Sequence, residues 1–120
     1  MIDGARLKPA LESVGHYISS PGGAEKPAVI PANFVLFELI TEGAVYAPDA
    51  DDLHGVGAIF VHHPGQSTVS RSPGEAYYAC MTARFQLDRL PRRFAWPRVF
   101  QWSDANEAVR FSQEALYAFH

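Results

Sequence analysis

Proline and glycine interrupt this chain at short intervals, which rules out long helices over most of its length. Many of the nine proline and nine glycine residues gather in pairs or triplets that mark turns, such as Pro21-Gly22-Gly23, Pro64-Gly65 and Pro73-Gly74. The segments between them are short and rich in β-branched and aromatic residues. This arrangement favours a mainly β fold, a sandwich or a barrel, over a fold in which helices and strands alternate.

Three of these segments have the composition of strands. Residues 34–40 are almost continuously apolar, as expected for a strand that is covered on both faces. Residues 58–61 are also apolar and stop before the turn at Pro64. Residues 77–87 alternate between two faces. One face carries Ala79, Met81, Ala83, Phe85 and Leu87, and the other carries Cys80, Thr82, Arg84 and Gln86. The third strand therefore has one apolar face and one mixed face.

The last part of the chain changes to a helical period. Ser103 or Asp104 is placed to accept the free N–H groups of a first helical turn, and no glycine or proline follows. Small and apolar residues then recur at helical spacing: Ala105, Ala108, Val109, Ser112, Ala115, Leu116 and Phe119. We therefore expect a β domain over residues 1–102 and a helix over residues 103–120 that is still running at the last residue.

Composition narrows the functional classes. With 120 residues, of which 48% are hydrophobic, the chain has the size and apolar content of one domain with one closed core. The net charge is -3 and the chain has only ten lysines and arginines, so it lacks the clustered positive charge that direct binding of nucleic acid requires. A single cysteine, Cys80, excludes an intrachain disulfide and suits a reducing compartment. No signal peptide or membrane span is recognisable, so we expect a soluble, cytoplasmic protein.

Several of these segments, in this order, resemble the N-terminal sensor domain of AraC-type transcription regulators. Residues 57–65, Gly-Ala-Ile-Phe-Val-His-His-Pro-Gly, resemble the G-D-x-x-x-x-P-P-G strand and turn of that domain, and residues 35–43 resemble the preceding strand. Residues 15–18 are similar to its opening strand, and Arg84-Phe85 together with residues 96–100 resemble the part where the barrel is followed by a helix. Two departures are Ala58, where the family usually has an acidic residue, and residues 66–68, which lack its usual histidine.

The resemblance implies a cupin-type (jelly-roll) β-barrel followed by a C-terminal α-helix. It also implies a function in transcription regulation: the barrel binds a small-molecule effector, and the helix forms a homodimer or links to a second domain. DNA would be read only by that second domain, which this chain has no room to contain. The alternatives are a free-standing cupin-like binding module and a metal-dependent cupin enzyme, because one fold hosts all three functions.

Ligand-binding residues are expected on the mixed face of the third strand. In a closed barrel one face of every strand points into the lumen, and small-ligand sites combine apolar walls with a few polar groups. The resemblance favours the face of Cys80 and Thr82, because these positions match effector-contacting positions of the family. In the alternative, Met81 and Phe85 fill the lumen instead. The predicted ligand-binding residues are Glu38, Tyr78, Cys80, Thr82 and Arg84.

Glu38 has two possible environments. If the strand over residues 34–40 is covered on both faces, the carboxylate of Glu38 is buried, and a buried carboxylate is costly unless it is paired. It should then meet Arg84, another cation or a polar ligand. The alternative is a glutamate that faces solvent at a sheet edge.

No metal, cofactor or catalytic centre is predicted. His62 and His63 are adjacent, so on a strand they diverge and cannot share one ion, and we expect a partly solvated pair beside the turn. Asp49, Asp51 and Asp52 lack the later glycine and glutamate of a calcium loop and indicate a solvated hairpin loop. Cys80 has no adjacent base. Ser67, Ser70 and Ser72 do not lie in the G-x-S-x-G motif of a nucleophilic serine. The basic residues of the connector are expected on a solvated face: Arg89, Arg92, Arg93 and Arg98. Trp96 and Trp102 are expected to pack under the helix.

The C-terminal helix is predicted to take part in association. A helix this short is marginal in water and must bury its apolar stripe against another surface. Part of the stripe can lie on the barrel, and the resemblance implies that the remainder meets a second copy of the chain. The predicted dimer interface consists of Val109, Leu116 and Phe119. The alternative is a helix that docks wholly on its own barrel.

Overall fold

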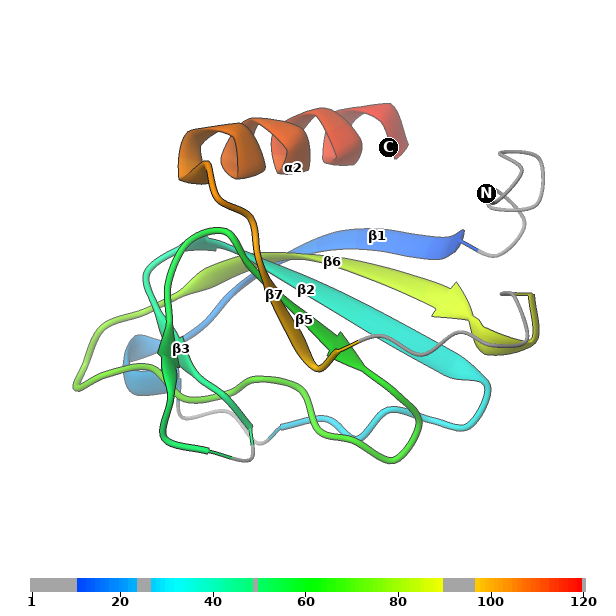
Figure 1. Cartoon of the computed structure of the whole chain (residues 1–120), viewed down its shortest axis with the longest axis horizontal. Helices are drawn as coiled ribbons and strands as arrows, with labels where there is room; N and C mark the ends of the chain where they lie inside the picture. The colour runs from blue at the N-terminus through cyan, green and yellow to red at the C-terminus, as the bar shows by residue number, and fades with distance from the viewer. Residues whose placement is uncertain (1–10, 24–26, 49, 90–96, 120) are drawn as a thin grey trace.

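The structure, a computed structural model, describes residues 11–23, 27–48, 50–89 and 97–119 (Figure 1). It is mainly β with one C-terminal helix, as predicted. Its elements are β1 (Leu11–Ile18), η1 (Pro21–Gly23), β2 (Phe34–Glu42), β3 (Val45–Tyr46), β4 (Leu53–His54), β5 (Ala58–His62), β6 (Ala79–Gln86), η2 (Leu87–Arg89), β7 (Val99–Gln101) and α2 (Ala105–Phe119). The predicted strands at residues 34–40, 58–61 and 77–87 correspond to β2, β5 and β6, and residues 15–18 lie in β1.

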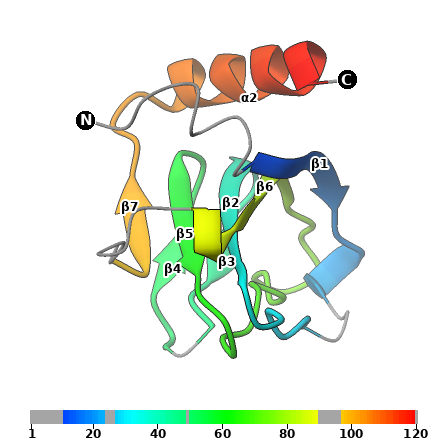
Figure 2. The same cartoon turned by 90° about the vertical axis from the view of Figure 1, so that its right-hand side faces the viewer.

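The strands form one large sheet and one small one. The large sheet is antiparallel, with the order β1-β6-β2-β5-β7, and β3 pairs with β4 in a separate hairpin. Two views at right angles place α2 across one side of the large sheet (Figures 1 and 2). Among the described residues these pairings do not close the sheet into a barrel, so the jelly-roll part of the prediction is not shown.

Each face of the large sheet carries its own hydrophobic cluster, because neighbouring residues of a strand point to opposite sides. The cluster on one face contains Ile40, Val45, Ala58, Phe60, Val69, Tyr78 and Cys80. The cluster under α2 contains Val14, Leu39, Met81 and Ala108. Adjacent residues such as Ile40 and Leu39 thus belong to different clusters. The predictions that residues 34–40 are covered on both sides and that β6 has two distinct faces are confirmed.

Gly57 ties the sheet to the segment that leads into α2. Its N–H donates a hydrogen bond to the carbonyl oxygen of Ile40 (3.0 Å), and its own carbonyl oxygen accepts one from the N–H of Trp102 (2.8 Å). The φ angle of Gly57 is +95°, and a Cβ atom there would lie 2.8 Å from the carbonyl oxygen of Trp102. Only glycine fits this conformation and this close approach. The turn before β5 therefore fixes where the chain turns toward the helix.

Helix α2 begins where its sequence predicts, and it packs on the large sheet. The carboxylate of Asp104 accepts a hydrogen bond from the N–H of Glu107 (3.1 Å), which is the expected N-cap. Ala108 and Ser112 are buried against the sheet, and the ring of Trp102 lies 5.2 Å from that of Phe111. The role predicted for Trp102 as a packing anchor is confirmed. Trp96 lies outside the described residues.

Candidate functional site

Glu38 is the centre of a buried polar cluster in the middle of β2. Its residue exposure is 4%. Glu38 Oε1 lies 2.6 Å from His62 Nε2 and accepts a hydrogen bond from the backbone N–H of Val69 (3.1 Å). The thiol of Cys80 donates to Glu38 Oε2 (3.6 Å). The prediction that a buried Glu38 meets a partner is confirmed, and the partner is His62 rather than Arg84.

The register of the sheet explains this cluster. Glu38 pairs with Phe60 on β5 and with Thr82 on β6, so the residues two positions away on each neighbouring strand lie diagonally across from it on the same face. On β5 that residue is His62, and on β6 it is Cys80. The two side chains approach the carboxylate from opposite sides. No short sequence motif links these three residues, because they come together only through strand pairing.

His62 contradicts the expected partly solvated pair. Its side chain is fully buried, because β5 continues to residue 62 and turns this ring to the same face as Phe60. The two rings are stacked, with centroids 6.1 Å apart and an interplanar angle of 6°. Nδ1 of His62 is buried without a hydrogen-bond partner in the part of the chain that the structure describes. His63, in contrast, is half-buried.

Cys80 is a weak hydrogen-bond donor and not a nucleophile. Burial, and next to it the negative charge of Glu38, raises the pKa of the thiol far above its ordinary value of 9.0. The reactive thiolate is therefore strongly disfavoured.

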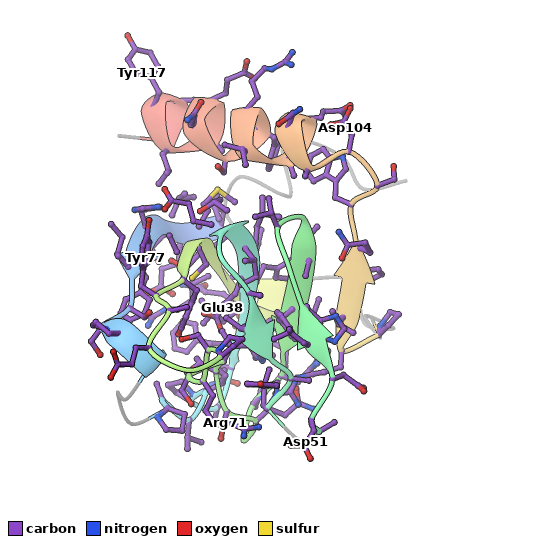
Figure 3. All side chains as sticks on the ribbon, turned by 90° about the vertical axis from the view of Figure 1, so that its left-hand side faces the viewer. Glu38, Asp51, Arg71, Tyr77, Asp104 and Tyr117 are labelled. Atoms are coloured by element: carbon purple, nitrogen blue, oxygen red, sulfur yellow. The ribbon has the colours of Figure 1, made fainter. Side chains whose placement is uncertain are left out.

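A cavity of about 320 Å³ opens beside the Glu38 cluster. Its walls include Leu36, Glu38, Thr68, Ser70, Tyr78 and Thr82. The hydroxyl of Tyr78 donates to the carbonyl oxygen of Val69 (3.1 Å), which holds the ring against this wall. Figure 3 shows Glu38 within the body of the domain, on the side of the sheet away from α2. Of the predicted ligand-binding residues, Glu38, Tyr78 and Thr82 line this cavity, and Cys80 lies behind it in contact with Glu38.

Arg84 does not line the cavity. Its guanidinium group pairs with the carboxylate of Glu12 (2.6 Å) and lies 4.2 Å from the ring centroid of Phe34. Thr68 and Ser70, which the sequence analysis did not select, do line it. They belong to the segment after the Pro64-Gly65 turn, and the bridge between Val29 and Ser67 holds the start of that segment in place.

The residues predicted for a dimer interface face the sheet more than expected. Leu116 packs against the cluster under α2, and Val109 is half-buried beside it. Nothing is described for the side chain of Phe119. The large apolar side chains that α2 exposes are Phe111 (46%) and Tyr117 (89%), and Tyr117 points away from the domain (Figure 3). No observation tests association itself.

The other charged residues have simple surroundings. Asp51 and Asp52 are exposed in the loop between β3 and β4, as predicted for a hairpin loop, and Asp49 lies outside the described residues. Arg98 donates to the carbonyl oxygen of Ser67 (2.8 Å). Arg92 and Arg93 lie outside the described residues, and nothing is described for the side chain of Arg89. Within the described ranges, no three histidine, cysteine or acidic side chains converge as metal ligands would.

No protein-family model matches the chain, and no curated protein matches it either. In the part of the chain that the structure describes, no helix has the length and apolar character needed to cross a membrane.

Proposed function

We propose that this chain is the effector-sensing domain of an AraC-type transcription regulator, a non-enzymatic cytoplasmic domain with a cupin-like barrel. It binds a small polar molecule in the cavity beside Glu38. The observation that carries the proposal is a buried carboxylate at the wall of a cavity of about 320 Å³ with hydroxyl groups around it. A volume near 300 Å³ with apolar walls and a few placed polar groups is typical of small-molecule sites.

The cavity favours a ligand that carries hydrogen-bond donors. Glu38 Oε1 already accepts two hydrogen bonds, but among the described residues Oε2 accepts only from the weak thiol donor of Cys80. A carboxylate oxygen can accept more than one bond, so Oε2 has capacity for a hydroxyl or amine of the ligand. The hydroxyls of Thr68 and Thr82 can both donate and accept. A small polyol, sugar or amine fits this set of groups.

Strand β6 connects the cavity to the helix. Thr82 lines the cavity, and its neighbour Met81 belongs to the cluster under α2. A ligand that binds one arrangement of this strand better than another shifts the equilibrium between them, and the helix on the opposite face responds. In a regulator, α2 would carry this response to a second copy of the chain and to a DNA-binding domain that lies outside this chain.

Replacing Thr82 with tryptophan tests the cavity. A panel of monosaccharides, polyols and small amines is screened by thermal unfolding and calorimetry, and we expect at least one compound to bind the unmodified protein. Thr82→Trp fills the cavity and should weaken that binding at least tenfold, while Ala76→Trp, which adds the same side chain on an exposed loop, should not. Unchanged affinity in a folded Thr82→Trp protein would place the site elsewhere. A panel without any binder would contradict a polar ligand.

The two alternative functions predict different results. A metal-dependent cupin enzyme should contain about one transition-metal ion per chain by elemental analysis, and His62→Ala should remove it. A free-standing binding module should show ligand binding with no DNA-binding domain in its natural reading frame. An AraC-type sensor should show ligand binding, no bound metal and a DNA-binding domain encoded in the same frame.

A further inference from the structure

We propose that the space between α2 and the large sheet is a second binding site, which takes an uncharged apolar molecule the size of one aromatic ring or a short hydrocarbon chain. A cavity of about 250 Å³ lies there, on the opposite face of the sheet from Glu38. Its walls include Phe37, Met81, Phe85, Trp102, Phe111 and Ala115. This site is independent of the proposed polar effector site.

Two pairs of aromatic rings belong to this cavity. On the sheet, the rings of Phe37 and Phe85 have centroids 5.3 Å apart, and next to the helix those of Trp102 and Phe111 are 5.2 Å apart. Phe37, Phe85 and Trp102 are only partly buried, and Phe111 is 46% exposed, although all four line the space between two packed layers. Side chains in a filled interface would be buried more completely, because protein interiors are close-packed. The helix and the sheet therefore leave room for a guest.

The walls select against polar ligands. The lining side chains carry only one polar atom, the indole nitrogen of Trp102, and the others are hydrocarbon or thioether. A water molecule needs two to four polar partners, so it gains little against these walls, and apolar cavities in other proteins bind molecules such as benzene. A charged ligand would lose its hydration without gaining a partner. The sulfur of Met81 adds a favourable contact for an aromatic ring. A neutral aromatic hydrocarbon is thus the best match.

A guest in this cavity would strengthen the docking of α2. Among the described residues, the buried side chains of α2 are two small ones, Ala108 and Ser112, and Leu116 packs partly buried against the cluster under the helix. Farther along the same face, Ala115 borders the cavity. A ring held between Ala115 and Phe37 would be in van der Waals contact with both layers, which favours the docked helix over an undocked one.

The proposal is tested with toluene as the probe and benzoate as its charged analogue. The chain has two methionines, Met1 and Met81, so ¹³C-methyl-methionine labelling gives two NMR signals, and Met81→Leu assigns the one in the cavity. We expect toluene to shift the Met81 methyl signal saturably and to raise the unfolding temperature with concentration. Benzoate at equal concentration should do neither. No saturable shift with toluene, or an equal response to benzoate, would overturn the proposal.

Filling the cavity with a side chain locates the site. Ala115→Leu adds carbon atoms from the helix and Ala83→Leu adds them from the sheet, and each should weaken toluene binding at least tenfold. Ala105→Leu, on the exposed first turn of the same helix, is the matched control and should bind as the unmodified protein does. Thr82→Trp should weaken toluene binding far less than Ala115→Leu does, which separates this site from the polar one.

Two results would reject this location. Toluene affinity that is unchanged in either folded filling variant would place the binding elsewhere. Nuclear Overhauser contacts to the Met81 methyl, in the absence of toluene, from a residue outside these walls, the large sheet and α2 would show that another segment of the chain already fills the space.

Discussion

Removing the carboxylate of Glu38 should destabilise this domain far more than removing an exposed carboxylate from the same strand. In Glu38→Ala the side chain of His62 and the backbone N–H of Val69 lose their acceptor while both stay buried. An unsatisfied buried donor costs about 1–3 kcal/mol, so two of them cost about 2–6 kcal/mol. We therefore expect a loss of about 4 kcal/mol.

Such a loss is a large share of the total stability of a small domain, which is about 5–15 kcal/mol. Glu38→Gln keeps an oxygen that can accept from Val69 and from Nε2 of His62, so we expect it to cost less than Glu38→Ala. The matched control is Glu42→Ala on the same strand. Glu42 is exposed, and its carboxylate accepts a bond from the exposed hydroxyl of Tyr77 (2.6 Å), so its loss should cost less than about 1 kcal/mol.

Urea denaturation measures these differences directly. The midpoint concentration gives the change in the free energy of unfolding, provided that the slope with urea stays the same in all four proteins. We expect the order of stability to be unmodified protein, Glu42→Ala, Glu38→Gln and Glu38→Ala. If Glu38→Ala cost no more than Glu42→Ala, the buried cluster around Glu38 would not hold the fold together, and this reasoning would be wrong.

Two further predictions concern Cys80 and α2. Burial and Glu38 raise the pKa of the Cys80 thiol above 9.0, so above about pH 9 the unfolded chain loses a proton that the folded chain keeps, and stability falls by up to about 1.4 kcal/mol per pH unit. Cys80→Ala should remove this slope in urea titrations at several alkaline pH values, and equal slopes in both proteins would contradict it. If α2 forms a dimer, Tyr117→Glu should give a monomer in sedimentation without a loss of thermal stability, because Tyr117 is 89% exposed. Leu116→Glu should lower thermal stability as well, and a monomeric unmodified chain would exclude the dimer.

The local parts of the fold could be predicted from the sequence because they depend on local chemistry. Alternation on residues 77–87 separates Met81 from Cys80 before any strand is paired. The continuous apolar run around Glu38 indicates burial on both faces, and Asp104 marks the start of α2. The order of the strands has no comparable local signal. The strand order determines which residue pairs with Glu38. The sequence alone therefore does not distinguish His62 from Arg84 as that partner.

Arg84 shows that two side chains on the same face of a strand need not belong to the same site. Arg84 and Thr82 alternate onto the same side of β6, but they lie two residues apart along the strand, which is about 6.6 Å. The register pairs Arg84 with Leu36, which lines the cavity, but the guanidinium group of Arg84 lies against Glu12 and the ring of Phe34 instead. The alternation of residues along a strand predicts only which face of the sheet a side chain lies on. The position of the site on that face depends on the segment that packs across it, and here that segment contributes Thr68 and Ser70 to the cavity wall.

The same alternation that separates the two hydrophobic clusters also separates two kinds of ligand chemistry. Thr82 contributes a hydroxyl to a cavity that has a carboxylate at its wall, and Met81 and Ala83 on either side of it contribute hydrocarbon and sulfur to a cavity under α2. One strand, β6, thus forms a wall of both cavities. In the proposed sensor, β6 is the element that would connect a ligand in the polar cavity to the docking of the helix.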